Sequence, residues 1–230
     1  MWNIDLTLVD VARVSRDAYA EAFRAVTGRP LVALPQLAGF TDSEIFFESL
    51  ALNEALPGVA SPDSDELLAR YHAQLAAAFC ARRGLLASQG RVLPGAREVL
   101  TAVARLPGVI QTVLTGTIKQ NAAEKLRAFD LDTHLDLDIG GFGSDAYPKG
   151  TQILRSLAMG SEKYGVPLSA ADTVYLADST RDVAAAKIVG ARCIAVASGR
   201  STASELRDCG AEQVLDDLAY TAGVVAAIGR

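Results

Sequence analysis

The fold is decided by a short stretch at the start of the 230-residue chain, Met1-Trp2-Asn3-Ile4-Asp5-Leu6-Thr7-Leu8-Val9-Asp10. Its apolar beginning predicts a short buried strand that leads directly into polar side chains. On a strand, residues i and i+2 point to the same side, so Asn3 and Asp5 are expected to leave the carboxyl end of this strand together. Open α/β sheets place their ligands at that end.

The composition predicts a protein with a substantial core. Half of the residues are hydrophobic, which suits one large domain or a core with a smaller insert. The 22 basic and 27 acidic residues give a net charge of −5 without a basic run, and this argues against nucleic acid or an anionic membrane as the main partner. No apolar run approaches the roughly 20 residues that span a bilayer.

The cysteines and histidines suggest neither disulfides nor a metal site. Cys80, Cys193 and Cys209 are odd in number and widely spaced, which predicts reduced thiols. His72 and His134 belong to no recognisable catalytic group. Because no basic segment precedes the first strand, we expect no signal peptide and a cytoplasmic protein. The Ala- and Arg-rich composition hints at a bacterial source.

Helical spacing dominates the part of the chain that follows the first strand. The apolar periodicity predicts helices over 11–26, 44–56 and about 65–84, with no strand between them. This pattern favours an inserted helical domain over residues 13–88. The core domain would then comprise residues 1–12 and 89–230.

From Val92 onward the pattern changes to alternating helices and strands. Predicted helices begin near Ala96, after Thr117, near Thr151 and after Asp182, and they alternate with predicted strands over 109–114, 135–139, 173–176, 193–196 and 213–215. Strands that alternate with helices indicate an α/β fold with a doubly wound parallel sheet.

The ends of three predicted strands carry short polar side chains. The residues in question are Asn3, Asp5 and Thr7, then Thr115 and Gly116, then Asp178 and Asp182, with Lys149 in the loop before another helix. Carboxylates at one sheet edge can hold Mg²⁺. A hydroxyl, a backbone N–H and a lysine can cradle phosphate oxygens, and Asp5 can act as a general acid and base. The set therefore indicates phosphoryl transfer.

In these residues the chain resembles the haloacid dehalogenase (HAD) superfamily of aspartate-nucleophile phosphatases. The family's first motif, Asp-x-Asp-Gly-Thr/Val, aligns with residues 3–7, and its fourth, Gly-Asp-x-x-x-Asp, aligns with residues 177–182. Thr115 matches the second motif and Lys149 the third. The resemblance implies a Rossmann-like core with a helical cap and an Mg²⁺-dependent phosphatase for a small-molecule substrate. It implies metal ligands at Asn3, Asp5, Asp178 and Asp182.

The sequence departs from this pattern at the nucleophile. Asn3 stands where the family has Asp, and an amide oxygen is a far poorer nucleophile than a carboxylate. The substitution also removes a negative charge, so Mg²⁺ should bind weakly or not at all. Leu6 replaces the motif's Gly and Ala177 replaces another, while Phe40 stands where many relatives carry Arg or Lys. Leu6 and Phe40 would make the pocket mouth apolar.

Several residues also have purely structural interpretations. Asp5 could anchor a loop, Asp178 and Asp182 could cap a helix, and Lys149 could be solvated. Thr41 and Asp42, in the same loop as Phe40, are candidates for substrate contact but resemble a helix N-cap more closely.

Three functions remain open from the sequence. The first is an Mg²⁺-dependent phosphatase in which Asn3 makes activity weak or absent, whether Asn3 is natural or engineered. The second is a repurposed enzyme that carries out cyclisation, elimination or isomerisation of an apolar metabolite between cap and core. The third is a non-catalytic pseudophosphatase.

Overall fold

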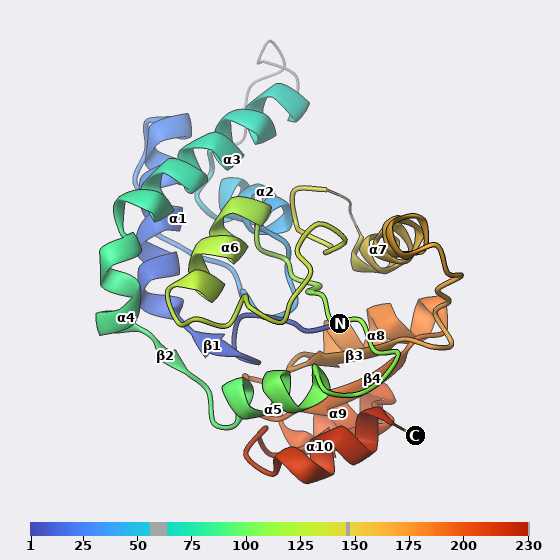
Figure 1. Cartoon of the computed structure of the whole chain (residues 1–230). Coiled ribbons are helices and arrows are strands. Elements are labelled where there is room, and N and C mark those ends of the chain that lie inside the picture. The colour runs from blue at the N-terminus through green and yellow to red at the C-terminus, as the bar shows by residue number, and fades with distance from the viewer. Residues whose placement is uncertain (56–63, 146–147, 230) are drawn as a thin grey trace.

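A parallel sheet lies in the lower half of the molecule in the view of Figure 1. The computed structural model describes residues 1–55, 64–145 and 148–229. Strands β3 (Val174–Ala177), β4 (Arg192–Val196) and β5 (Gln213–Leu215) pair in parallel in that order. Trp2 extends this sheet through parallel bridges to Leu176 and Val113. The opening stretch of the sequence therefore runs through the middle of the sheet.

Alternating side chains divide the core between the two faces of the sheet. Tyr175, Ala177, Cys193 and Ala195 belong to one buried cluster, whereas the intervening strand residues, such as Leu176 and Ile194, belong to the other. A strand buried on both faces is typical of a sheet covered by helices on either side. The α/β class with a doubly wound parallel sheet is confirmed.

The described second half of the chain contains six helices, of which the first four were predicted and the last two were not. They are α5 (Ala96–Val103), α6 (Lys119–Arg127), α7 (Lys149–Tyr164), α8 (Thr180–Val189), α9 (Ala203–Cys209) and α10 (Thr221–Ile228). Buried residues of α5 and α10 share the cluster on one face of the sheet, and those of α7, α8 and α9 share the cluster on the other.

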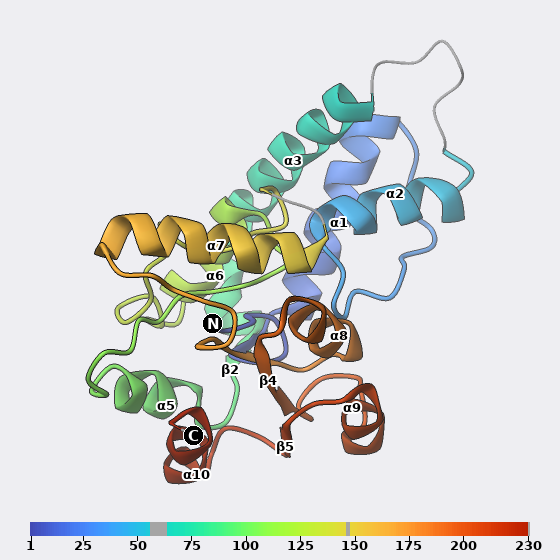
Figure 2. The ribbon, with the colours of Figure 1, turned by 90° about the vertical axis from the view of Figure 1, so that its right-hand side faces the viewer.

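The first half of the chain is helical, as the spacing predicted. It contains α1 (Ala12–Thr27), α2 (Asp42–Leu52), α3 (Ser64–Ala81), the 3₁₀ turn η1 (Arg83–Leu85) and α4 (Leu86–Gln89). In the described part of this region no strand lies between β1 (Val9–Asp10) and β2 (Arg91–Val92), which pair antiparallel. Figure 2 shows α1, α2 and α3 together at the end of the molecule opposite α9 and α10.

Three predicted strands are shorter than predicted or absent, and of the opening one only Trp2 is bridged to the parallel sheet. The segment 109–114 makes only isolated bridges, at Val113 and Leu114, and the segment 135–139 forms turns. The side chain of Asp136 accepts a hydrogen bond from the N–H of Asp138, and such a local turn competes with strand pairing. Gly141 pairs with Leu114 in place of the predicted strand.

The boundaries of the second predicted helix are also different. The helix α2 begins at Asp42, two residues earlier than predicted, and ends at Leu52. Its predicted end at residue 56 lies outside the described residues.

Among the described residues, no helix is both long and apolar enough to cross a membrane.

Candidate functional site

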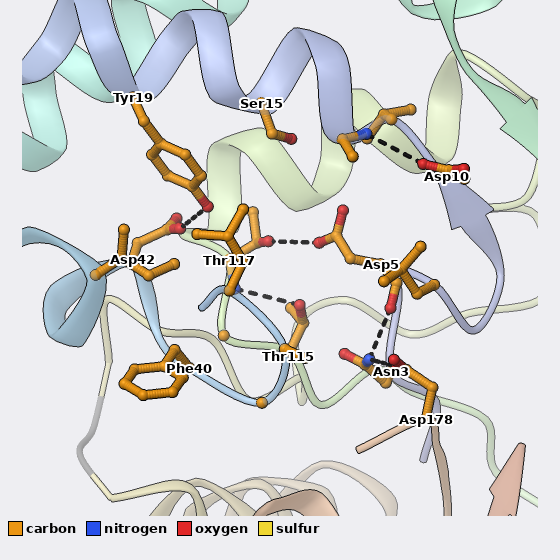
Figure 3. A pocket seen from close by; sticks show the side chains of 18 of the residues that line it. Asn3, Asp5, Asp10, Ser15, Tyr19, Phe40, Asp42, Thr115, Thr117 and Asp178 are labelled. Atoms are coloured by element: carbon orange, nitrogen blue, oxygen red, sulfur yellow. Dashed lines mark hydrogen bonds between the residues drawn. The ribbon is translucent and has the colours of Figure 1, made fainter. Parts of the chain in front are cut away.

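The side chain of Asn3 points at Asp178 across the edge of the sheet (Figure 3). Its amide nitrogen donates to Asp178 Oδ1 at 2.8 Å and to the main-chain oxygen of Asp5 at 2.9 Å. Thr7 Oγ1 donates to the same oxygen of Asp178 at 3.0 Å. Burial raises the pKa of Asp178 to about 7, and the neighbouring Asp182 carboxylate contributes to the rise. The first and fourth motifs thus form one hydrogen-bonded unit.

The carboxylate of Asp5 turns toward Lys125 on α6. Lys125 Nζ lies 2.8 and 2.7 Å from the two carboxylate oxygens of Asp5, and Thr117 Oγ1 donates to one of them at 2.9 Å. The Lys125 side chain is only 2% exposed, whereas that of Asp5 is 37% exposed. A buried ammonium requires a counter-charge. In this structure Asp5 supplies that charge.

Lys149, the first residue of α7, is buried rather than solvated. Its Nζ lies 2.5 Å from Asp182 Oδ1, which also accepts from the hydroxyl of Tyr175 at 2.9 Å. The other oxygen of Asp182 accepts from Ser179 Oγ at 2.5 Å. Asp182 is fully buried. Both of its oxygens are therefore engaged with protein donors.

The second-motif residues lie directly beneath the loop that leads into α2. Thr115 Oγ1 accepts a hydrogen bond from Thr117 N at 3.2 Å. The N–H of Asp42 donates to the carbonyl oxygen of Gly116 at 2.7 Å. A Cβ atom at Gly116 would lie 2.0 Å from the carbonyl oxygen of Phe40, so only glycine allows this approach. The loop before α2 thus covers the residue predicted to cradle phosphate.

The predicted N-cap at Thr41 is confirmed. Thr41 Oγ1 accepts from Glu44 N at 3.2 Å, and Glu44 Oε2 accepts from Thr41 N at 2.8 Å, which is a complete capping box. The buried Asp42 carboxylate accepts from the Tyr19 hydroxyl at 2.7 Å and from Ile118 N at 2.8 Å. Burial raises the pKa of Asp42. Asp42 therefore joins α1, α2 and the second-motif loop.

Phe40 is held by the fourth-motif loop. The guanidinium of Arg181 lies 3.9 Å from the centre of the Phe40 ring, and Arg181 also forms an ion pair with Glu44. Gly39 has φ +74°, and a Cβ atom there would lie 2.5 Å from Ser179 Oγ. These contacts hold the loop before α2 against the sheet edge.

Leu6 adopts a backbone conformation that favours glycine. Its φ is +58°, in the left-handed region, where a side chain costs about 1–2 kcal/mol. The carbonyl oxygen of Leu6 accepts from Ser198 Oγ at 2.6 Å, which helps to hold the turn. Leu6 therefore adopts the left-handed conformation that suits the Gly of the family motif at this position. Ala177, the other replaced Gly, is fully buried at the end of β3.

One cavity of about 80 Å³ unites most of the predicted site (Figure 3). Every candidate residue lines it except Thr7, Thr41 and Asp182. The charged residues that line it are Asp5, Asp10, Asp42, Asp178 and Lys149. Because Lys149 is paired with Asp182, the described lining offers no unpaired cation to a phosphate dianion.

The residues as they stand do not fit a divalent cation. A cation needs oxygen ligands, but the Asn3 amide presents its N–H₂ group to the main-chain oxygen of Asp5 and to Asp178. The carboxylates of Asp5 and Asp182 are each engaged by a lysine. In the described part of the chain, no group of three His, Cys, Asp or Glu side chains is arranged to hold a metal.

Three residues that shape the site are not among those predicted from the sequence. Lys125 alters the environment of Asp5, Arg181 holds Phe40, and Tyr19 binds Asp42. Lys125 left a signal, because it shares the buried face of α6 with Ala122 and Leu126. A lysine among apolar positions of a helix indicates a buried ion pair. The roles of Arg181 and Tyr19 depend on contacts between distant segments.

Solved structures share the fold at low sequence identity. A hydrolase from Pseudomonas syringae has 21% identity and a TM-score of 0.68, with 99% of this chain and 97% of that chain covered. A HAD hydrolase, family IA, variant 3, from Entamoeba histolytica has 18% identity and a TM-score of 0.69, with coverage of 100% and 98%. A mutant of CbbY from Rhodobacter sphaeroides, in complex with xylulose-(1,5)bisphosphate, has 22% identity and a TM-score of 0.64, with coverage of 95% and 93%.

A comparison with curated protein sequences finds no match. The family model described as haloacid dehalogenase-like hydrolase matches residues 1–187, most of the chain. This match includes the opening stretch, the second-motif loop, Lys149 and the fourth-motif loop, which meet around the cavity. The chain belongs to the haloacid dehalogenase-like hydrolase family.

Proposed function

We propose that this chain is a phosphatase-type HAD protein whose phosphomonoesterase activity is weak or absent. The observation that carries the proposal is the orientation of the Asn3 amide, whose nitrogen is committed to Asp178 and to the main-chain oxygen of Asp5. A neutral amide has no carboxylate with which to attack phosphorus. Loss of a covalent nucleophile lowers kcat on the order of 10⁴- to 10⁶-fold in other enzymes.

The partners of Asp5 support the same proposal. Both carboxylate oxygens of Asp5 contact Lys125 Nζ, and Thr117 occupies part of the remaining acceptor capacity. A general acid or base must exchange a proton with the reacting group. An Asp5 that serves as the counter-charge of a buried lysine is poorly suited to that exchange.

The test compares the wild type with Asn3→Asp against a panel of phosphate esters in the presence of Mg²⁺. Asn3→Ala, which offers neither carboxylate nor amide, is the matched control. We expect negligible turnover by the wild type and by Asn3→Ala. Turnover by the wild type at ordinary rates, between about 1 and 10³ s⁻¹, would contradict the proposal. Turnover by Asn3→Asp alone would identify position 3 as the single missing component of a phosphatase.

A second candidate is non-phosphoryl chemistry on an apolar metabolite, such as cyclisation, elimination or isomerisation. The cavity lining favours it, since Leu6 and Phe40 contribute apolar surface and Lys149 is already paired. A phosphate dianion would be desolvated there without a cationic partner. If Asn3→Asp restores no turnover and the wild type binds an apolar ligand in this cavity, this candidate gains over the first. A non-catalytic pseudophosphatase would bind ligand without converting it.

The remaining assignments rest on the family and the sequence. We propose residues 13–88 as the helical cap and residues 1–12 and 89–230 as the core, with a small-molecule ligand between them. The contacts from Phe40 and Asp42 to the sheet edge support a cap that closes over the site. A bacterial source and a cytoplasmic location stay predictions from the sequence.

A further inference from the structure

The position of Asn3 has a consequence for metal binding in addition to that for nucleophilic attack. Asn3 is 6% exposed, and its amide nitrogen lies between two oxygens that belong to distant parts of the chain, the main-chain oxygen of Asp5 and Oδ1 of Asp178. Two acceptor oxygens that face the same point repel each other unless donor hydrogens or a cation lie between them. In this chain the two amide hydrogens of Asn3 meet that requirement.

The partners of the amide decide which of its two ends faces the site. Nitrogen and oxygen of an asparagine amide have nearly the same shape, so their assignment depends on the hydrogen-bond network. The main-chain oxygen of Asp5 can only accept a hydrogen bond. If the amide were reversed, its oxygen would lie about 3 Å from that carbonyl oxygen with no hydrogen between them. The nitrogen must therefore face both acceptors.

A carboxylate at the same position would create the opposite situation. Its oxygen would replace the Asn3 nitrogen beside the Asp5 carbonyl and Asp178, which would bring three oxygens together with two negative charges. Such a cluster is the coordination environment that Mg²⁺ prefers, and it is unfavourable when empty. With asparagine at position 3, the oxygens of Asp5 and Asp178 that could bind a cation instead accept hydrogen bonds from the Asn3 amide.

Two ion pairs, independent of the Asn3 amide, leave little free negative charge for a cation. Asp5 pairs with Lys125, and Asp182 pairs with Lys149. Asp178 is the remaining carboxylate of the predicted metal set. Oδ1 of Asp178 accepts hydrogen bonds from both Thr7 Oγ1 and Asn3. A Cβ atom at Gly199 would lie 2.0 Å from Oδ2 of Asp178. The backbone at Gly199 thus closes the far side of this carboxylate.

We propose that the Asn3 amide takes the place of the divalent cation, so that the site is complete without metal. The proposal goes beyond reduced phosphatase activity because it concerns the protein alone, with no substrate present. It can therefore fail while the proposed function stands, and the reverse also holds.

The test is cation binding by the full-length protein after treatment with a chelator. Calorimetric titration with Mg²⁺ and Mn²⁺ and thermal unfolding with and without millimolar Mg²⁺ are measured for the wild type, Asn3→Asp and Asn3→Ala. For the wild type we expect no saturable heat and no shift of Tm. Saturable binding by the wild type that is weakened in Asn3→Ala, whether or not it is tighter in Asn3→Asp, would overturn the proposal.

The two variants separate the role of the amide from that of its hydrogen bonds. Asn3→Asp should have a lower Tm than the wild type in chelator and should recover on the order of 5 °C or more when Mg²⁺ is added. Asn3→Ala loses the hydrogen bonds without adding charge, so its lower Tm should not respond to Mg²⁺. If Asn3→Asp is as stable as the wild type in chelator, or does not respond to Mg²⁺, the amide is not a cation substitute. If it folds only in Mg²⁺, the proposal is supported.

Discussion

Lys125 and Asp5 form an ion pair across 120 residues of sequence, with Nζ 2.7 and 2.8 Å from the two carboxylate oxygens. The two partners differ in their exposure to solvent, since the Lys125 side chain is 2% exposed and that of Asp5 is 37% exposed. The pair joins α6 to the loop that carries the first motif.

Removal of Asp5 should destabilise the protein more than removal of Lys125. Asp5→Asn leaves a buried ammonium without a counter-charge, which costs about 3–5 kcal/mol. Lys125→Met leaves a carboxylate that faces the cavity and is partly hydrated, so its cost should be about 1–2 kcal/mol. Urea unfolding of both variants and of the double variant measures the two losses and their coupling. Equal losses that add in the double variant would show that the pair is not the source of the stability.

Leu6→Gly should be more stable than Leu6→Ala. Both variants lose the leucine side chain, but only glycine relieves the strain at φ +58°. The difference should be about 1 kcal/mol, opposite in sign to the preference for alanine over glycine in a helix. Chemical denaturation of the two variants checks this order. A more stable alanine variant would mean that the turn at Leu6 relaxes without penalty.

Gly39→Ala should be more destabilising than Gly28→Ala. The two glycines have nearly the same φ, +74° and +72°, so both substitutions carry the same backbone strain. A Cβ atom at Gly28 meets nothing within 4 Å, whereas one at Gly39 would lie 2.5 Å from Ser179 Oγ and 2.7 Å from Arg181 Cβ. We expect an additional loss of about 1–3 kcal/mol for Gly39→Ala, measured by urea unfolding. Equal losses would indicate that the loop before α2 moves away at little cost.

His72 should make the stability depend on pH in mildly acidic solution. Burial lowers the pKa of His72, whose Nε2 lies 3.1 Å from Ser43 Oγ, below its ordinary value of 6.5. The unfolded chain therefore binds a proton first as the pH falls, and the folded state loses stability from about pH 6.5 downward. The unfolding free energy of the wild type should thus fall relative to that of His72→Gln as the pH falls through this range.

The matched control for that experiment is the exposed histidine, His134→Gln. Subtraction of its profile removes contributions that do not belong to the position of His72. A wild-type profile that runs parallel to that of His72→Gln between pH 7 and 5 would exclude the predicted linkage.

Most of the fold could be predicted because its signals are local. The alternation of residues such as Tyr175 and Leu176 between two buried clusters is a property of the strand itself, and Gly28, which ends α1 in the left-handed conformation, is a local glycine signal just beyond the helix predicted over 11–26. The segment 135–139 was predicted wrongly because the Asp136 side chain forms a turn that its apolar neighbours conceal. The Thr41 cap was predictable since Glu44 follows it by three residues.

The sequence by itself determined the α/β class, the family motifs and the fact that an amide occupies the nucleophile position. These properties depend on residue identity and on short-range spacing. Only the tertiary structure decided where the Asn3 amide points and which lysine neutralises Asp5. Asp178 lies 175 residues from Asn3, and Lys125 lies 120 residues from Asp5. Since buried polar groups must find partners wherever the folded chain brings them, local pattern does not reveal those partners.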